Sequence, residues 1–235
     1  MKFVWIYGKH ASEAALRNEN RIIYEARCIT EQTKNLVKQI RPEMRVNMVD
    51  ERNLNRTTKG GLHQGIALCC EATQVEKKLP QELEHGRILV LDHLQDVGNI
   101  GSIMRSMVAM DFRCLITSQR DTPDLEQVSV KAACGAIEYL KIIQVSNIRQ
   151  VLVELKKRDY RCIGLDQDGR NHTTSKSDRV AIVVGSEGYG LQSIVRKECD
   201  EILTLKTAKD FNVLNASVAA AIAMYQINNS IGCHL

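Results

Sequence analysis

The chain has 235 residues, a length that suits two domains when a domain takes roughly 150 residues. Its composition, 44% hydrophobic and 26% charged, is that of a globular protein and argues against wholesale disorder. No apolar stretch approaches the roughly 18 residues of a membrane helix, and the apolar run at 3–7 is too short for a secretory signal. We therefore expect a cytoplasmic protein with no membrane segment.

Positive charge is concentrated at the start of the chain. The net charge is +4, but residues 1–80 carry 14 Lys and Arg against 9 Asp and Glu, whereas residues 81–235 carry 18 against 19. A basic excess of this kind suits a part of the chain that meets a phosphate backbone, although a solvated basic surface gives the same pattern.

The first third of the chain alternates short apolar runs with helical patterns. The predicted order is strand 3–7, helix 11–17, strand 21–29, helix 31–40, strand 45–50 and strand 65–70. A polar, glycine-rich turn at 57–65 precedes the last strand. We predict a small α/β domain over residues 1–71, followed by a polar linker at 72–86 that contains a proline.

The pattern changes from residue 87 onward. Five short runs are apolar throughout and do not alternate: RILVLD, FRCLIT, RCIGL, RVAIVV and EILTL. Such runs are typical of strands buried on both faces of a parallel sheet, and helical stretches lie between most of them. We therefore predict a parallel-sheet α/β domain over residues 87–235. The eight cysteines include no C-x-x-C pair, so the sequence indicates no metal site.

The first segment that could carry chemistry follows the run RILVLD and reads DVGNIGSIMR, from Asp96 to Arg105. Its apolar residues fall at helical spacing, which predicts a helix that starts near Asn99. Asn99 and Arg105 are six residues apart, about 240° around a helix, so they converge only if Asn99 lies at or before the helix cap. A helix cap followed by a surface arginine is the alternative interpretation.

The second segment follows the run RVAIVV and reads GSEGYG, from Gly185 to Gly190. Glycines at a strand end let the backbone approach a ligand closely and offer it N–H groups. The spacing is not G-x-G-x-x-G, and Glu187 would repel a pyrophosphate, which argues against a nucleotide-dependent oxidoreductase. A carboxylate here better suits a sugar hydroxyl or a cation such as a sulfonium.

The third segment is LNASVAAAIAM, from Leu214 to Met224. Its many small residues allow a helix that packs very close to another backbone. On its own the segment is equally an alanine-rich helix with an Asn or Ser cap.

Taken together, the three segments resemble the ordered motifs of the SpoU/TrmH family of RNA 2′-O-ribose methyltransferases in the SPOUT superfamily. The segment KAACGAIE at 131–138 looks like the family's G-A-x-E segment. I-Y-G-x-H at 6–10 and H-Q-G at 63–65 are similar to the substrate-binding domain that many members carry. The resemblance covers nearly the whole chain and is nearest to the branch that methylates guanosine in large-subunit ribosomal RNA.

The resemblance implies an enzyme that transfers a methyl group from S-adenosylmethionine to a ribose 2′-hydroxyl of RNA, in 23S ribosomal RNA at a guanosine. It implies an RNA-binding domain at 1–71, a deep trefoil knot in the domain at 87–235, and a homodimer. Two alternatives stay open, a transfer RNA 2′-O-methyltransferase and a non-catalytic RNA-binding homologue. Few aromatic residues are available for base stacking, which favours recognition of a folded RNA.

The resemblance also implies the site residues. The catalytic positions are Asn99, Arg105, Glu187 and Asn215. The cofactor-binding positions are Val184, Gly185, Glu187, Gly188, Gly190, Leu203, Leu205, Leu214, Ala216 and Ser217. The expected RNA-binding positions are His10, Arg52, Arg56, Lys59, His63 and Gln64. Each RNA-binding position could equally be an ordinary surface side chain.

Two departures from the family pattern concern the third motif. Val213 stands where the family has a serine before Leu214 and Asn215, and Leu205-Lys206-Thr207 replaces the usual I-P-M, with Lys209 at a glycine position. A lost hydroxyl near the reacting centre slows catalysis if it leaves a buried partner unpaired, at a cost of about 1–3 kcal/mol. We expect a weakened or altered enzyme more than an inactive one.

Overall fold

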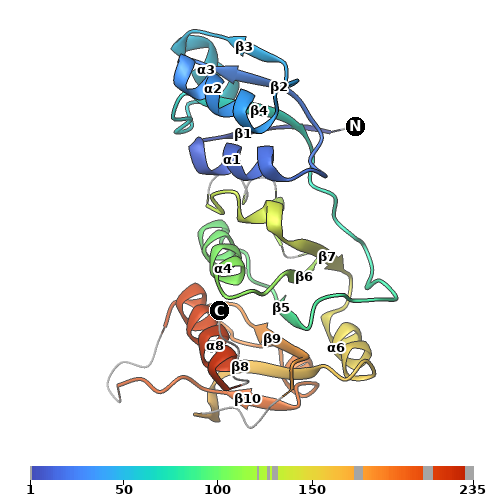
Figure 1. Cartoon of the computed structure of the whole chain (residues 1–235). Helices are drawn as coiled ribbons and strands as arrows, with labels where there is room; N and C mark the ends of the chain where they lie inside the picture. Colours follow the sequence, from blue (N-terminus) through green and yellow to red (C-terminus); the bar gives the residue numbers. More distant parts are fainter. Residues whose placement is uncertain are drawn as a thin grey trace. The chain divides into compact units, whose positions relative to one another are not determined.

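The computed structural model describes residues 2–120, 122–125, 128, 132–171, 177–208 and 214–230. The chain divides into two compact units (Figure 1). Unit 1 comprises Met1–Gln74 and Asp124–Tyr139, and unit 2 comprises Val75–Pro123 and Leu140–Leu235. No helix in the described ranges is long and apolar enough to cross a membrane.

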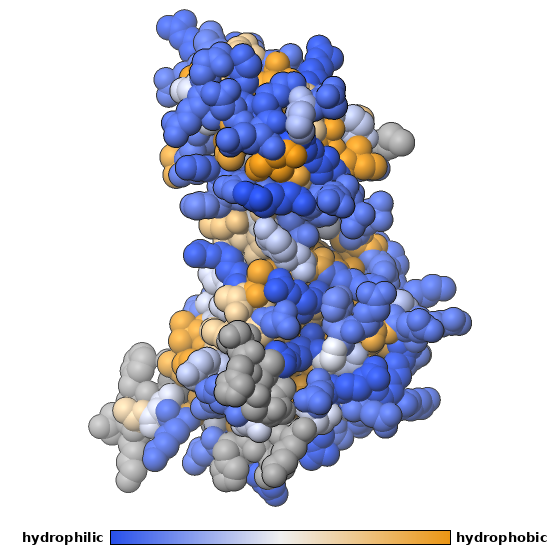
Figure 2. Space-filling model, viewed as in Figure 1, coloured by the Kyte–Doolittle hydropathy of each residue, from blue (hydrophilic) through white to orange (hydrophobic). Residues whose placement is uncertain are grey.

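Unit 1 is built on a four-stranded mixed sheet in the order β1-β4-β2-β3, in which β2 and β3 pair in parallel and the other neighbours pair antiparallel. Its elements are β1 (Phe3–Tyr7), α1 (Lys9–Arg17), β2 (Ile23–Cys28), α2 (Glu31–Ile40), β3 (Val46–Met48), α3 (Glu51–Thr58) and β4 (Ile66–Glu71). Ile6, Leu16, Val37 and Leu68 belong to its buried core. The face seen in Figure 2 is mostly hydrophilic over this unit, as expected when the apolar side chains are buried in the core.

Helix α3 was not predicted, because its sequence shows no apolar stripe. Only Leu54 and Thr58 of its eight residues are buried. The helix begins at an N-cap, where the Asp50 side chain accepts a hydrogen bond from Asn53 N at 2.7 Å. It ends at Lys59, which has a left-handed backbone with φ 54°. The predicted turn at 57–65 therefore begins inside the last turn of α3.

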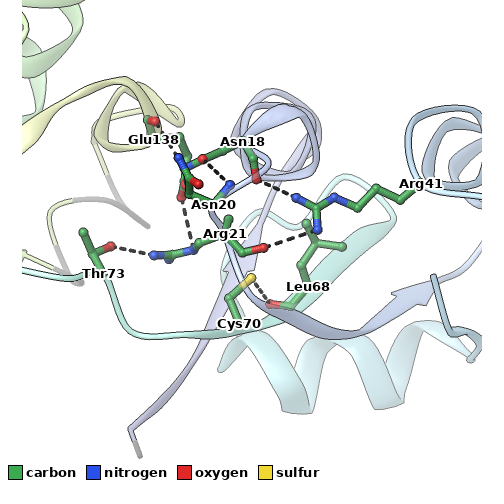
Figure 3. Close-up of polar contacts among 8 residues, drawn as sticks. All are labelled: Asn18, Asn20, Arg21, Arg41, Leu68, Cys70, Thr73 and Glu138. Atoms are coloured by element: carbon green, nitrogen blue, oxygen red, sulfur yellow. Dashed lines mark hydrogen bonds and ion pairs between the residues drawn. The ribbon is translucent and has the colours of Figure 1, made fainter. Parts of the chain in front are cut away.

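Part of the chain between β6 (Cys114–Ser118) and β7 (Lys141–Val145) packs on unit 1, although the sequence placed it in the C-terminal domain. A short 3₁₀ helix, η1 (Ala136–Tyr139), contacts α1. Glu138 forms an ion pair with Arg21 at 3.5 Å and accepts a hydrogen bond from Asn18 Nδ2 at 2.9 Å (Figure 3). The Arg21 and Glu138 side chains are only 7% and 2% exposed, so this pair is buried.

Unit 2 is built on a six-stranded sheet whose strands all run parallel, in the order β10-β8-β9-β5-β6-β7. Its elements are β5 (Arg87–Leu91), α4 (Val97–Ala109), β6, β7, α6 (Ile148–Lys156), β8 (Arg161–Arg170), β9 (Val180–Val184), α7 (Ser193–Arg196), β10 (Glu201–Leu203) and α8 (Ala216–Ser230). The predicted parallel-sheet α/β architecture is confirmed.

One strand of unit 2 was missed. The run KIIQV of β7 contains a lysine and a glutamine, and it did not read as a continuous apolar strand. Beyond β7, Glu76 from the segment predicted as a linker forms two backbone hydrogen bonds with this strand, to Ile142 and from Gln144. The start of unit 2 therefore extends the sheet at its β7 edge.

Because the strands of unit 2 run parallel, their carboxyl ends lie together at one edge of the sheet. Residues of α6 pack with Ile88, Val90 and Ile116 in one buried cluster. Helices α4 and α8 contact each other, and α8 also contacts β8 and β9. The α8 residues Ala220 and Ala223 are fully buried, which permits the close helix contact that the small residues predicted.

Candidate active site

Three of the four predicted catalytic side chains meet in one hydrogen-bonded cluster. Asn99 Nδ2 donates to Glu187 Oε1 at 2.8 Å. Asn215 Nδ2 donates to the same Glu187 oxygen at 2.8 Å and to Asn99 Oδ1 at 2.8 Å. Each pair of these three residues is therefore joined directly, although they come from α4, the loop after β9 and the start of α8.

Two helix caps hold the asparagines of this cluster. The Asp96 side chain caps α4 and accepts from Asn99 N at 2.7 Å, which fixes the first turn of the helix. Asn215 Oδ1 accepts from Ser217 N at 2.9 Å and from Ser217 Oγ at 2.6 Å. With its oxygen held at the beginning of α8, the Asn215 amide must direct its NH₂ group toward Asn99 and Glu187.

Arg105 lies outside this cluster because of its position on α4. Asn99 is the third residue of the helix, not its cap, so the condition for convergence with Arg105 is not met. At 100° per residue, the two side chains leave the helix in directions about 120° apart. Asn99 is buried and Arg105 is exposed, which agrees with this separation.

The glycine turn between β9 and α7 is closed by its own backbone. Ser186 and Gly190 exchange two hydrogen bonds, Ser186 N to Gly190 O at 3.1 Å and Gly190 N to Ser186 O at 2.9 Å. A Cβ atom at Gly185 would lie 2.2 Å from the carbonyl of Gly190, so this position requires glycine. Gly190 has φ 62°, so it is a second position in this turn that favours glycine.

A cavity of about 370 Å³, which we call the loop cavity, opens beside this turn. Nine of the ten predicted cofactor-binding residues line it: Val184, Gly185, Glu187, Gly188, Gly190, Leu203, Leu205, Leu214 and Ala216. The tenth, Ser217, is not among the lining residues and instead bonds to Asn215. Of the positions that depart from the family pattern, Val213 and Lys209 lie outside the described residues, whereas Leu205 and Thr207 line the cavity.

Sequence reasoning missed the contribution of β8 to the loop cavity. Leu165, Asp166 and Gln167 line it, and Asp166 forms an ion pair with Arg196. The signal was available, because RCIGL was predicted as a parallel strand and its carboxyl end had to reach the same edge as Gly185.

A second cavity of about 460 Å³ lies on the other side of the same turn, and we call it the Asp96 cavity. It shares Glu187 and Tyr189 with the loop cavity and is also lined by His93, Asp96 and Gln192. Tyr189 is 95% exposed at the tip of the turn. The cluster residue Glu187 therefore stands between two cavities, an arrangement suited to bringing two reactants together.

Two predicted RNA-binding residues occupy the turn before β4 in unit 1. Gln64 is exposed, and its Oε1 accepts from Lys9 N at 2.8 Å at the beginning of α1. His63 is buried, and its Nδ1 accepts from Gly65 N at 3.0 Å. The His63 ring therefore shapes the turn more than it offers a surface.

The other predicted RNA-binding residues are exposed on helices of unit 1. Arg52 and Arg56 lie on α3, Lys59 is its C-cap, and His10 lies in the first turn of α1. The hydrogen bond from Lys9 to Gln64 joins the beginning of α1 to the turn that follows Lys59. These positions give unit 1 a set of exposed basic side chains on neighbouring elements.

Comparison with known proteins relates both units to RNA methylation. Residues 86–225 match the SpoU rRNA methylase family, and residues 5–75 match the RNA 2′-O ribose methyltransferase substrate-binding domain. The chain is 30% identical over 230 residues to the 23S rRNA (guanosine-2′-O-)-methyltransferase RlmB of Neisseria meningitidis, covering 93% of this chain and 92% of that protein.

Two solved structures share the fold. The SpoU methyltransferase AviRb from Streptomyces viridochromogenes, in complex with AdoMet, matches with a TM-score of 0.79 at 18% identity over 97% of this chain and 89% of that chain. An AdoMet-bound rRNA methyltransferase from Sinorhizobium meliloti matches with a TM-score of 0.79 at 17% identity over 97% and 87%. At these identities the likeness concerns the fold alone.

Proposed function

The chain belongs to the SpoU family of RNA 2′-O-ribose methyltransferases, and from this premise we propose that it methylates a guanosine ribose of 23S ribosomal RNA. The observation that carries the proposal is the hydrogen-bonded cluster of Asn99, Glu187 and Asn215, in which Glu187 lines both the loop cavity and the Asp96 cavity. Similarity to RlmB over nearly the full length of both proteins supports the choice of RNA.

The loop cavity fits S-adenosylmethionine by its chemistry. Leu203, Leu205 and Leu214 offer apolar surface to an adenine ring, and the closed turn from Gly185 to Gly190 offers backbone polar groups. Glu187 places a carboxylate oxygen at the edge of the cavity, where a positive charge is favoured over a phosphate. When bound, S-adenosylmethionine supplies an electrophilic methyl group on a cationic sulfur.

Side chains of this chain orient the reacting groups and bind the RNA backbone. We assign Glu187, held by the amides of Asn99 and Asn215, to orienting the reacting groups by hydrogen bonds. An arginine is always protonated near neutral pH, so we assign Arg105 to gripping the phosphate beside the target ribose instead of accepting its proton. This division leaves alignment of the two reactants as the main source of catalysis.

Unit 1 serves as the RNA-binding part in this proposal. Arg52, Arg56 and Lys59 are exposed on and after α3, where they are free to meet phosphates. His10 and Gln64 stand on the neighbouring elements, and Gln64 holds the beginning of α1. We place the protein in the cytoplasm, with the ribosomal RNA.

A homodimer and a knotted C-terminal unit complete the proposal. Val218, Ile222 and Tyr225 are exposed along α8 at the spacing of one helix face, opposite the buried Ala220 and Ala223. An apolar face of this kind suits a second copy of the chain. The family relationship supports the trefoil knot in unit 2.

Calorimetric titration with S-adenosylmethionine, with S-adenosylhomocysteine as a parallel ligand, tests the proposal first. We expect saturable binding near one ligand per chain, followed by transfer of labelled methyl to an unmodified 23S RNA transcript. If labelled methyl appears in transfer RNA and not in 23S RNA, the substrate is transfer RNA. Cofactor and RNA binding without methyl transfer would favour a non-catalytic RNA-binding protein, the alternative that Val213 in the third motif supports.

A further inference from the structure

A third cavity of about 240 Å³ lies at the carboxyl ends of β6 and β7, and we call it the arginine cavity. The residues that matter for its chemistry are His93, Ser118, Arg120, Ser146, Arg149 and Gln192. They lie at or just after the ends of β5, β6 and β7 or at the beginnings of α6 and α7, so the sheet sets their spacing. No acidic side chain is among the described residues that line this cavity.

The arginine cavity is positively charged. Arg120 is exposed on the loop after β6. Arg149 Nε lies 3.3 Å from Glu198 Oε2, but Glu198 is also bonded to Lys156 at 2.6 Å. One carboxylate thus pairs with two cations, Arg149 near the beginning of α6 and Lys156 at its end, so Glu198 neutralises Arg149 only in part. Two guanidinium groups with hydroxyls beside them are the groups that bind phosphate oxygens best.

A fixed pair of side chains separates the arginine cavity from the Asp96 cavity. Both cavities are lined by His93 and Gln192, whose side-chain nitrogens lie 3.0 Å apart. Asp92, fully buried below them, accepts from Gln192 N at 2.8 Å and contacts His93 Nδ1 at 2.6 Å. Because the Gln192 amide nitrogen can only donate, the His93 ring carries its proton on Nδ1, toward Asp92.

The Asp92 carboxylate therefore holds His93 and Gln192 as a wall between the two cavities. The cluster residue Glu187 lines the cavity on one side of this wall, and two arginines line the cavity on the other side. An RNA strand whose reacting ribose lies at the Asp96 cavity has a basic cavity directly across this wall. We propose that the arginine cavity binds a backbone phosphate of the substrate RNA, near the methylated nucleotide on the same strand. This inference rests on the proposed function, and it adds a phosphate subsite formed by Arg120 and Arg149.

The salt dependence of RNA binding tests this subsite. The probe is an unmodified 23S RNA transcript, and its dissociation constant is measured across a series of salt concentrations. The test protein carries Arg120→Gln and Arg149→Gln together. Arg120 is exposed, and Glu198 keeps Lys156 as a partner when Arg149 is changed, so we expect the variant to fold. Lys157→Gln, which removes an exposed charge at the opposite end of α6, is the matched control.

We expect the double variant to bind RNA at least about fivefold more weakly near 0.1 M salt, whereas Lys157→Gln binds like the unaltered chain. The slope of log affinity against log salt should fall by about 0.7–0.9, the change expected for one lost phosphate contact. Equal affinity and slope in all three proteins would overturn the subsite, as would equal losses in the double variant and the control.

Titration with S-adenosylmethionine separates failure of the subsite from failure of the proposed function. The double variant should bind the cofactor as the unaltered chain does, because the loop cavity does not include either arginine. If the unaltered chain binds cofactor and RNA but the arginine changes have no effect, only the subsite is wrong. If the unaltered chain binds neither cofactor nor RNA, the proposed function fails and the subsite with it.

Discussion

Asn99 and Glu187 are separated by 88 residues in the chain, yet Asn99 Nδ2 donates a hydrogen bond to Glu187 Oε1 at 2.8 Å. The same oxygen accepts a second hydrogen bond, from Asn215 Nδ2. One carboxylate oxygen therefore joins the beginning of α4, the glycine turn and the beginning of α8. The position of Glu187 consequently depends on two helix caps and not on its own exposed turn alone.

Replacing Glu187 by glutamine tests the charge of this oxygen. The amide oxygen of Gln can still accept from Asn99 and Asn215, but hydrogen bonds to a charged acceptor contribute about 1.5–3 kcal/mol and a neutral one less. We expect Glu187→Gln to reduce methyl transfer by about tenfold or more, as measured by initial rates with labelled S-adenosylmethionine. Because Glu187 is exposed, the weaker hydrogen bonds should lower the thermal unfolding midpoint only slightly. An unaltered rate would show that the carboxylate charge has no part in the reaction.

The glycine turn offers a matched pair of substitutions. At Gly185 a Cβ would meet the Gly190 carbonyl at 2.2 Å, whereas at Gly188 nothing lies within 4 Å of such an atom. We expect Gly185→Ala to displace the turn, to abolish or strongly weaken cofactor binding, and to destabilise the fold by about 1–3 kcal/mol. Gly188→Ala should leave the stability of the fold unchanged and disturb cofactor binding much less, because nothing in the chain lies near the added atom. Calorimetry and thermal unfolding measure them, and similar behaviour of the two variants would contradict this account of the turn.

Much of the candidate site was predictable because each motif follows a strand of one parallel sheet. The runs RILVLD and RVAIVV became the neighbouring strands β5 and β9, so Asn99 and Glu187 had to reach the same edge. Asn215 was placed by its position before the alanine-rich helix, whose start it caps. The loop cavity follows from the same rule, since β8, β9 and β10 end beside it.

The unpredicted features depend on tertiary contacts that leave no periodic pattern. Asp92 reads as the end of a strand, and nothing in the sequence shows that it holds His93 and Gln192 from below. Whether the side chains of Asn99 and Arg105 converge depends on where α4 begins. Asp96 supplies the cap and moves the start of α4 ahead of Asn99, which separates the two side chains. The packing of 132–139 on unit 1 required knowledge of the buried partner Arg21.

Arg105→Lys tests the proposed grip on a phosphate. Lysine keeps the charge but loses the planar pair of N–H donors that binds two phosphate oxygens at once. We expect the rate of methyl transfer to fall by about tenfold or more while binding of S-adenosylmethionine stays unchanged, because Arg105 does not line the loop cavity. A single-turnover assay measures the rate, with calorimetry for the cofactor. Retention of most of the rate would count against a two-point grip.

The buried thiol of Cys162 and the half-buried thiol of Cys199 predict how stability changes at high pH. Burial raises the pKa of Cys162 and of Cys199 to about 12 from an ordinary 9.0, with the charge of Asp200 adding to the shift. The unfolded chain releases these protons above about pH 9, whereas the folded chain keeps them until about pH 12. Their contribution to stability is therefore fully present below pH 9 and is lost as the pH rises from 9 to 12.

Urea unfolding at pH 8 and pH 10.5 measures this loss. Removing one thiol should reduce the drop in the free energy of unfolding between the two pH values, so we expect a smaller drop in Cys199→Ala than in the unaltered chain. Cys134→Ala, a change at an exposed thiol, is the control and should show the full drop. Equal drops in all three proteins would show that the Cys199 thiol titrates alike in the folded and unfolded chain.

The buried pair of Arg21 and Glu138 predicts a large effect on the stability of unit 1 (Figure 3). Glu138→Ala leaves the Arg21 guanidinium buried without its carboxylate partner, and it removes the side-chain acceptor of Asn18 Nδ2. Breaking a buried ion pair in this way costs about 3–5 kcal/mol. Glu13→Ala, which breaks the exposed pair with Arg17, should cost at most about 1 kcal/mol.

Fluorescence of Trp5 reports these losses, because it is the single tryptophan of the chain and lies in β1 of unit 1. We expect urea unfolding followed at this residue to shift strongly to lower urea in Glu138→Ala and little in Glu13→Ala. The double variant Arg21→Met with Glu138→Gln should recover part of the loss, since it removes both buried charges. If Glu138→Ala and Glu13→Ala shift the midpoint equally, the segment that carries Glu138 is not held on unit 1 by this pair.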